Sequence, residues 1–182
     1  MFKRILKYIK TRLYVNETII LFFLEQFQNQ ISKVEIKYAT YDNLKDILNF
    51  QDKRYIKIFE NFLNIGDKGY FAYLNDKCVH RSWVKFNEQI VYPHFASSYK
   101  LKKDEIFIHY CETSLEARGQ NIYPHVLSVI CNEHKLNKIL IAINEKNIPS
   151  LKGAKKVGFC ELYKIHVLII LGIKFVKYEN KK

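Results

Sequence analysis

Residues 115–127 read LEARGQNIYPHVL and join an expected strand to a helix expected over 122–132. Free backbone N–H groups and the helix dipole converge where a helix begins, so such a junction suits an anionic group, typically a phosphate. Gly119 lets the backbone approach a ligand closely, Asn121 is one of the few non-glycine residues that tolerate a left-handed conformation, and Arg118 adds a positive charge. Taken alone, the segment also fits an ordinary turn before a helix.

The composition limits the kind of protein that carries this segment. A chain of 182 residues with 48% apolar and 15% aromatic residues suits a single domain with a sizeable core. The formal net charge of +12 favours an anionic partner such as nucleic acid, a phosphorylated cofactor or acidic lipid, but lysines on solvated faces explain the excess equally well. Four cysteines without a CxxC pair and six histidines without paired ligand spacing predict no metal site. A reducing, cytoplasmic location fits best.

The first 32 residues are predicted to form a basic N-terminal extension. Residues 1–13 carry five cations and no acid, and their apolar residues recur at helical spacing, as in an amphipathic helix. Such a helix can attach to an anionic membrane surface, here the inner face of the cytoplasmic membrane, or it can pack on its own domain with its lysines in water. The apolar run over 19–24 is too short to span a bilayer.

The remaining chain alternates between strand and helix spacing and shows no repeat and no linker rich in Pro, Gly or Ser. One or two helices are expected over 41–64 and single helices over 122–132 and 149–157. Strands are expected over 18–24, 33–39, 69–74, 77–86, 105–113, 138–143, 162–171 and 173–178. This order predicts an α/β fold with a mixed, mostly antiparallel twisted sheet and helices on both faces.

A second segment, further along the chain, helps to interpret residues 115–127. Residues 144–159 read NEKNIPSLKGAKKVGF. Together the two segments resemble the GNAT acetyltransferase superfamily, in which a strand, an Arg/Gln-x-x-Gly-x-Gly/Ala loop and a helix bind the pyrophosphate of acetyl-CoA, and a strand and an Asn-x-x-Ser/Ala … Gly-Phe helix follow. Residues 118–123 occupy the position of the loop, and the helix motif matches at Asn147, Ser150, Gly158 and Phe159. The resemblance spans roughly residues 69–159.

The resemblance implies an acetyltransferase that moves an acetyl group directly from acetyl-CoA to an amine or hydroxyl of a small acceptor. The exposed backbone of the strand 109–114 would hold the pantetheine arm and polarise the thioester carbonyl. The cofactor-binding positions that it implies are Thr113, Arg118, Gly119, Gln120, Asn121, Ile122, Tyr123, Asn147 and Ser150.

The chain departs from the family pattern at three positions. Asn121 and Tyr123 replace the two later glycines of the loop, so the loop depends on a left-handed Asn121 and on a bulky residue where the helix begins. Ala154 stands where many family members carry a tyrosine that protonates the departing thiolate. Another group serves as the acid, the thiolate leaves unassisted, or the chain is catalytically silent.

A general base must reach the acceptor directly or through one water. Glu105 and His109 share one face of the strand 105–113 by its period of two, and they are the candidates for this role. The same alternation places Cys111 on the face of His109, and it points Glu112 the other way unless a bulge intervenes.

The sequence predicts the acceptor substrate less precisely than the cofactor. Residues 87–103 offer hydroxyl and imidazole groups that would suit a sugar, and the helix start Gln120-Asn121-Ile122-Tyr123-Pro124 resembles family members of surface-glycan synthesis, so an amino sugar is one hypothesis. The alternatives are a silent GNAT-like module that binds CoA or a partner and, with charge alone in its favour, a nucleic-acid-binding domain. The oligomeric state stays open, with a dimer among the options.

Overall fold

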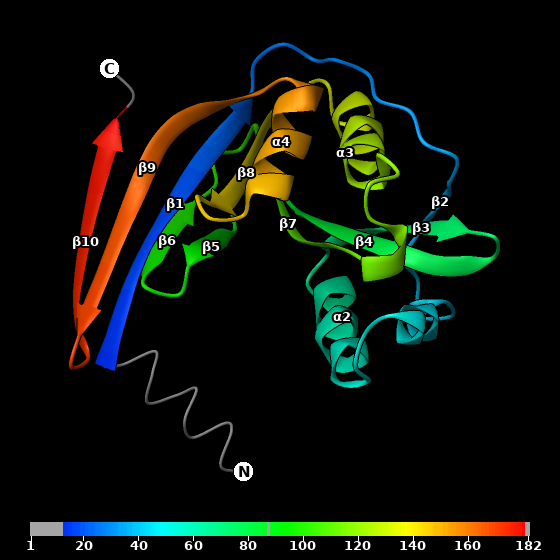
Figure 1. The fold of residues 1–182 in the computed structure, drawn as a ribbon, viewed down its shortest axis with the longest axis horizontal. Coiled ribbons are helices and arrows are strands. Elements are labelled where there is room, and N and C mark those ends of the chain that lie inside the picture. The colour runs from blue at the N-terminus through cyan, green and yellow to red at the C-terminus, as the bar shows by residue number, and fades with distance from the viewer. Residues whose placement is uncertain (1–12, 87, 181–182) are drawn as a thin grey trace.

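The computed structural model describes residues 13–86 and 88–180 (Figure 1). Their elements in chain order are β1 (Tyr14–Leu24), β2 (Glu35–Tyr38), the 3-10 helix η1 (Leu44–Asn49), α2 (Arg54–Asn64), β3 (Lys68–Leu74), β4 (Lys77–Lys85), β5 (Ile90–His94), β6 (Ser97–Lys100), β7 (Glu105–Thr113), η2 (Leu115–Ala117), α3 (Ile122–Glu133), β8 (Lys138–Asn144), α4 (Ile148–Val157), β9 (Phe159–Ile170) and β10 (Ile173–Asn180). The range 41–64 therefore contains two helices, one of them a 3-10 helix, and the range 87–103 contains two short strands.

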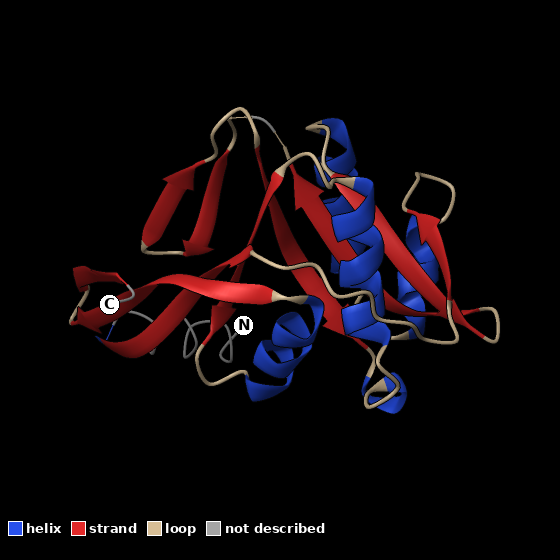
Figure 2. Ribbon diagram, turned by 90° about the horizontal axis from the view of Figure 1, so that it is seen from above, coloured by secondary structure: helices blue, strands red, loops and turns tan. Residues whose placement is uncertain are grey.

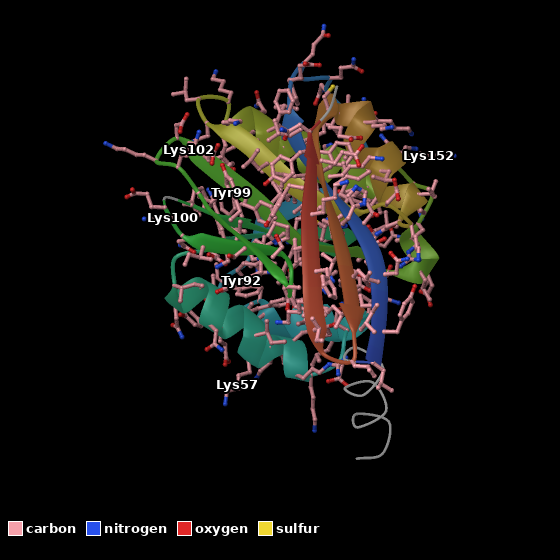
Figure 3. All side chains as sticks on the ribbon, turned by 90° about the vertical axis from the view of Figure 1, so that its left-hand side faces the viewer. Lys57, Tyr92, Tyr99, Lys100, Lys102 and Lys152 are labelled. Carbon is pink, nitrogen blue, oxygen red and sulfur yellow. The ribbon has the colours of Figure 1, made fainter. Side chains whose placement is uncertain are left out.

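Eight strands form one sheet in the order β10-β9-β1-β8-β7-β4-β3-β2. All neighbours are antiparallel except β7 and β8, which are parallel, so the predicted mixed, mostly antiparallel sheet is confirmed. Helices α3 and α4 cover one face (Figure 2). The other face carries α2 and the β5–β6 hairpin, and Figure 3 shows Lys152 of α4 and Tyr92 of the hairpin on opposite sides of the strands.

Strand β1 lies inside the sheet, between β8 and β9. The range 1–32, predicted as an extension, thus contains a strand whose inward residues Leu21 and Phe22 are almost wholly buried. Residues 1–12, where the amphipathic helix was predicted, lie outside the described residues. After β1 the chain crosses over α4 and α3 to reach β2 at the far edge of the sheet (Figure 1), and we call residues 25–32 the crossover segment.

The core is divided by the sheet. The largest cluster lies between the sheet and α3 and α4 and includes Ile106, Ile108, Val126 and Ile141. On the other face, one cluster packs around Phe59 of α2, and two lie beneath the β5–β6 hairpin. This division leaves the carboxyl end of β7 next to helices on both faces, which is where the sequence places its motifs.

A β-bulge interrupts β7 near this end. Trp83 of β4 pairs with His109, but Arg81 pairs with Glu112, so Tyr110 and Cys111 together oppose a single residue. Tyr110 has φ +50°, a left-handed conformation that a side chain rarely adopts. The predicted strict alternation is therefore wrong beyond His109: Cys111 packs with the α3 side core.

The bulge also ends the pairing of the two parallel strands. Pairs between β7 and β8 run from Glu105 and Lys138 to Ile108 and Ile141 and go no further, although both strands continue. The last residues of β7 thus have no partner on the β8 side, which leaves backbone groups available to a ligand.

Candidate active site

The loop between β7 and α3 has the left-handed geometry that its sequence predicts. Gly119 has φ +82°, and Asn121, the residue that precedes α3, has φ +58°. The side chain of Asn121 makes no capping bond to the helix. Among the described residues, no protein acceptor binds the backbone N–H groups of Gly119, Asn121, Ile122 and Tyr123. Four such donors at a helix N-terminus form a site for an anion.

The crossover segment is joined to this loop by side-chain hydrogen bonds. Ser32 Oγ donates to the carbonyl of Gln120 at 2.7 Å, and Asn121 Nδ2 donates to the carbonyl of Ile31 at 3.1 Å. Lys156 Nζ of α4 donates to Asn121 Oδ1 at 3.3 Å. The polar groups of Asn121 therefore bind the protein, and the helix N–H groups stay free for a ligand.

A cavity of about 570 Å³ opens in front of these N–H groups. Its lining joins the end of β7, the loop and the first turns of α3 and α4: Cys111, Glu112, Thr113, Ala117, Arg118, Gly119, Asn121, Ile122, Tyr123, Pro124, Asn147, Pro149, Ser150, Lys152, Gly153 and Lys156. Three cations and one carboxylate make this wall basic, which suits a ligand with several negative charges.

Most of the predicted cofactor-binding residues meet in this cavity. Only Gln120 is missing from its lining, because its carbonyl is turned toward Ser32. Glu112, Lys152 and Lys156 were not among the predicted site residues. The two lysines lie four residues apart in α4 and so share one helix face, a spacing that was visible in the sequence.

The Asn-x-x-Ser motif begins α4. Asn147 Oδ1 accepts a hydrogen bond from the backbone N–H of Ser150 at 3.3 Å, so Asn147 is the N-cap of the helix. Ala154 is fully buried against the sheet and does not line the cavity. Tyr123 of α3 supplies a phenol to the cavity wall. Its ring lies so close to Gly153 that a Cβ added to Gly153 would stand 2.6 Å from the ring.

Burial raises the pKa of Tyr123 well above its usual value, so its phenol keeps its proton at neutral pH. The ring also lies 6.0 Å from that of His80 on β4. His80 is fully buried and shares hydrogen bonds with Thr113 Oγ1 at 2.7 Å and Ser82 Oγ at 2.8 Å. Burial, assisted by the nearby charge of Arg81, lowers the pKa of His80 to about 3, so this imidazole is neutral and fixes Thr113 in the cavity wall.

A second cavity of about 380 Å³ adjoins the first and shares Glu112, Thr113 and Arg118 with it. The end of η1, the start of β4 and the segment 114–116 complete its lining. The two cavities therefore meet at Glu112, Thr113 and Arg118. Two reactants that enter from opposite sides could meet there.

Arg81 binds Glu112, one of the residues that line both cavities. Its side chain is only 3% exposed, and its guanidinium donates to Glu112 Oε2 at 2.9 Å, to Gln51 Oε1 at 2.9 Å and to the carbonyl of Tyr110 in the bulge. The guanidinium carbon lies 5.0 Å from the ring of Tyr55. A buried cation with full hydrogen bonding and aromatic contacts is held in one orientation, and so is the carboxylate that it binds.

The two predicted general bases lie apart from both cavities. Glu105 is fully buried at the opposite end of β7, where burial alone would raise its pKa but hydrogen bonds from Tyr99 and Lys102 and the ion pair with Lys138 lower it. His109 lies beside Asp67, with Nε2 3.2 Å from Oδ2, and burial lowers its pKa in spite of this carboxylate. Both groups have protein partners, and neither lines a cavity.

The predicted acceptor segment 87–103 also serves the fold. His94 Nε2 lies 3.4 Å from Glu17 of β1, and Ser97 Oγ shares a hydrogen bond with Tyr178 of β10. Neither side chain lines a cavity. Among residues 13–86 and 88–180, no helix is long and apolar enough to cross a membrane.

Solved structures share this architecture. A GNAT-family acetyltransferase from Colwellia psychrerythraea superposes with a TM-score of 0.64 at 12% identity over 92% of this chain and 57% of its own. The chain has the GNAT acetyltransferase fold. An aminoglycoside 6′-N-acetyltransferase from Acinetobacter baumannii shares it with a TM-score of 0.53 at 12% identity, over 70% of this chain and 91% of its own.

The glucosamine N-acetyltransferase region of a fungal multi-domain beta-N-acetylglucosaminidase reaches a TM-score of 0.64 at 8% identity, over 96% of this chain and 22% of that one. No protein-family model and no curated protein sequence matches the chain. This chain thus spans 57% of the Colwellia protein, and at such identities the likeness concerns the GNAT fold alone.

Proposed function

We propose that the protein is an acetyltransferase that moves an acetyl group from acetyl-CoA to an amine or hydroxyl of a small polar acceptor. The observation that carries the proposal is the set of four free N–H groups of Gly119, Asn121, Ile122 and Tyr123, in a cavity wall with Arg118, Lys152 and Lys156. The diphosphate of CoA has the charge and the acceptor oxygens that this wall would bind. The sequence motif and the GNAT fold support the same ligand.

The residues of the shared wall would carry the transfer. Backbone N–H groups at the bulge around Cys111 would polarise the thioester carbonyl, since the strand has no β8 partner there. The acceptor would enter through the second cavity and meet the thioester beside Glu112 and Thr113. Glu112 is the carboxylate within reach of both cavities and would take the proton of the acceptor, in the place of Glu105 and His109.

Tyr123 would supply the proton for the departing thiolate. It is the protonated phenol in the wall of the first cavity, and it comes from α3, whereas the family tyrosine would come from position 154 on α4. Phenylalanine keeps the ring that packs on Gly153 and removes only the hydroxyl. Tyr123→Phe should therefore lower kcat and leave the affinity for acetyl-CoA unchanged.

Amino sugars of a surface-glycan pathway are the acceptor class that we propose to test first. Two proteins of the same fold act, by name, on aminoglycosides and on glucosamine. A second candidate function is a silent module that binds CoA without turnover. The observation in its favour is that Ala154 is buried and that both predicted bases lie outside the cavities.

Calorimetric titration with acetyl-CoA, followed by thiol release with amino sugars, polyamines and peptides, tests the proposal. Arg118→Ala should weaken acetyl-CoA binding about tenfold, because one charged hydrogen-bond donor to a phosphate is lost. Lys135→Ala, which removes a cation outside both cavities, is the matched control. Binding without turnover would favour the silent module, and unchanged affinity in Arg118→Ala would contradict the assignment of the loop.

A further inference from the structure

The free ends of β1, β9 and β10 carry an apolar surface that none of the described elements covers. Six residues form it, each between 42% and 74% exposed: Leu13, Tyr14, Ile170, Leu171, Ile173 and Phe175. We call it the strand-end patch. In Figure 1 these ends of the three strands project away from the helices.

The strand pairing shows that the patch is continuous. Tyr14 of β1 pairs with Ile170 of β9, and Ile170 pairs with Ile173 of β10. Phe175 lies two residues along β10 from Ile173, on the same face, and pairs with Leu168. Leu13 and Leu171 are joined by a backbone hydrogen bond at the tip. Large contiguous apolar patches on a protein surface usually mark an interaction site.

Positively charged residues adjoin the patch along the chain. Residues 1–12, directly before Leu13, contain five lysines and arginines and no acidic residue. Lys177 of β10 is exposed, shares the face of Ile173 and Phe175, and forms no ion pair with a described residue. Lys174 is also exposed, on the opposite face of the same strand. An apolar face bordered by cations fits an anionic phospholipid surface, where side chains enter the headgroup region and lysines bind the headgroups.

We propose that the strand-end patch docks the protein on an anionic lipid bilayer. A second copy of the chain fits less well, since an isologous contact would bring two basic segments together and each chain carries a net charge of +12. The lysines of the edge strand β10 also oppose edge-to-edge pairing. The patch shares no residue with either cavity, so a docked protein keeps both open.

Co-sedimentation with vesicles tests the proposal. The full chain is mixed with vesicles of phosphatidylcholine alone or of an equal mixture of phosphatidylcholine and phosphatidylglycerol. It should bind only the anionic vesicles, and binding should fall with rising salt. The double variant Ile173→Ser/Phe175→Ser should bind about tenfold more weakly, because its apolar side chains no longer enter the bilayer.

The control removes two exposed apolar side chains elsewhere, Leu136→Ser/Ile65→Ser, and should bind as the unchanged protein does. All substituted side chains are exposed, and thermal denaturation checks that each variant folds. Equal vesicle binding by the patch variant, or no binding by the full chain, would overturn the proposal. So would a dimer in sedimentation velocity that the patch variant loses. Acetyl-CoA affinity should be the same in every variant, so this test is independent of the proposed function.

Discussion

Asn121 is the residue at which the loop departs most from the family pattern, and its replacement separates two effects. In Asn121→Ala the backbone must keep φ +58° with a β-carbon and no compensating polar group, which costs about 1 kcal/mol. The side-chain bonds to Ile31 and Lys156 are also lost, at about 0.5 kcal/mol each because they are exposed. The variant should therefore lose about 2 kcal/mol of unfolding free energy.

Asn121→Gly loses the same two bonds but removes the backbone strain, so it should lose only about 1 kcal/mol. For a chain of this size, each kcal/mol lowers Tm by about 2–4 °C. Thermal denaturation of the two variants beside the unchanged protein measures the difference. Calorimetry with acetyl-CoA should show weaker binding for the alanine variant, since a loop that leaves the left-handed conformation no longer aims its N–H groups at the cavity.

The comparison between Asn121→Ala and Asn121→Gly tests whether the left-handed conformation of residue 121 limits stability. If Asn121→Gly destabilised the protein as much as Asn121→Ala, the left-handed conformation of residue 121 would not limit stability. The predicted backbone strain in the alanine variant would then be refuted. If both variants bound acetyl-CoA as the unchanged protein does, the orientation of the loop would not matter for the ligand.

Three further perturbations follow from the structure. Gly158→Ala should cost more than about 3 kcal/mol in urea unfolding, because φ is +100° and the added Cβ would lie 1.7 Å from the carbonyl oxygen of Gln26. His80 keeps a depressed pKa of about 3 in the fold, so its contribution to stability is complete above about pH 6.5 and is lost as pH falls toward 3. His80→Asn should flatten this loss in urea unfolding at several pH values. Arg81→Met should free Glu112 and the bulge and lower kcat/KM in steady-state assays, with acetyl-CoA affinity retained.

Each of these three predictions has a result that would contradict it. A Gly158→Ala protein as stable as the original would mean that the crossover segment moves freely at this contact. An unchanged pH dependence in His80→Asn would assign the loss of stability to other groups, among which His94 and His109 also have lowered pKa values. A loss of acetyl-CoA binding in Arg81→Met equal to the loss of turnover would show that Arg81 supports the whole site and not Glu112 alone.

The sequence alone determined the order of elements and most of the conformation of the loop between β7 and α3, because both depend on local properties of the chain. Alternation and helical spacing are short-range properties, and the elements that they predicted over 69–86 and 105–157 are present within a few residues of the predicted bounds. The left-handed conformation of Asn121 and the glycine at 119 were also readable, because backbone preference belongs to the single residue.

Tertiary structure alone decided which strand fills the gap between β8 and β9 and which carboxylate reaches the cavity. Pairing between β1 and β9 joins residues about 150 positions apart, and no local pattern encodes it. The bulge at Tyr110 reverses the facing of Cys111 because Arg81 and the aromatic residues of α2 hold it, and these contacts come from other elements. A period of two predicts faces only while a strand stays regular, so a single extra residue at the bulge places Glu112, and not His109, in the cavity wall.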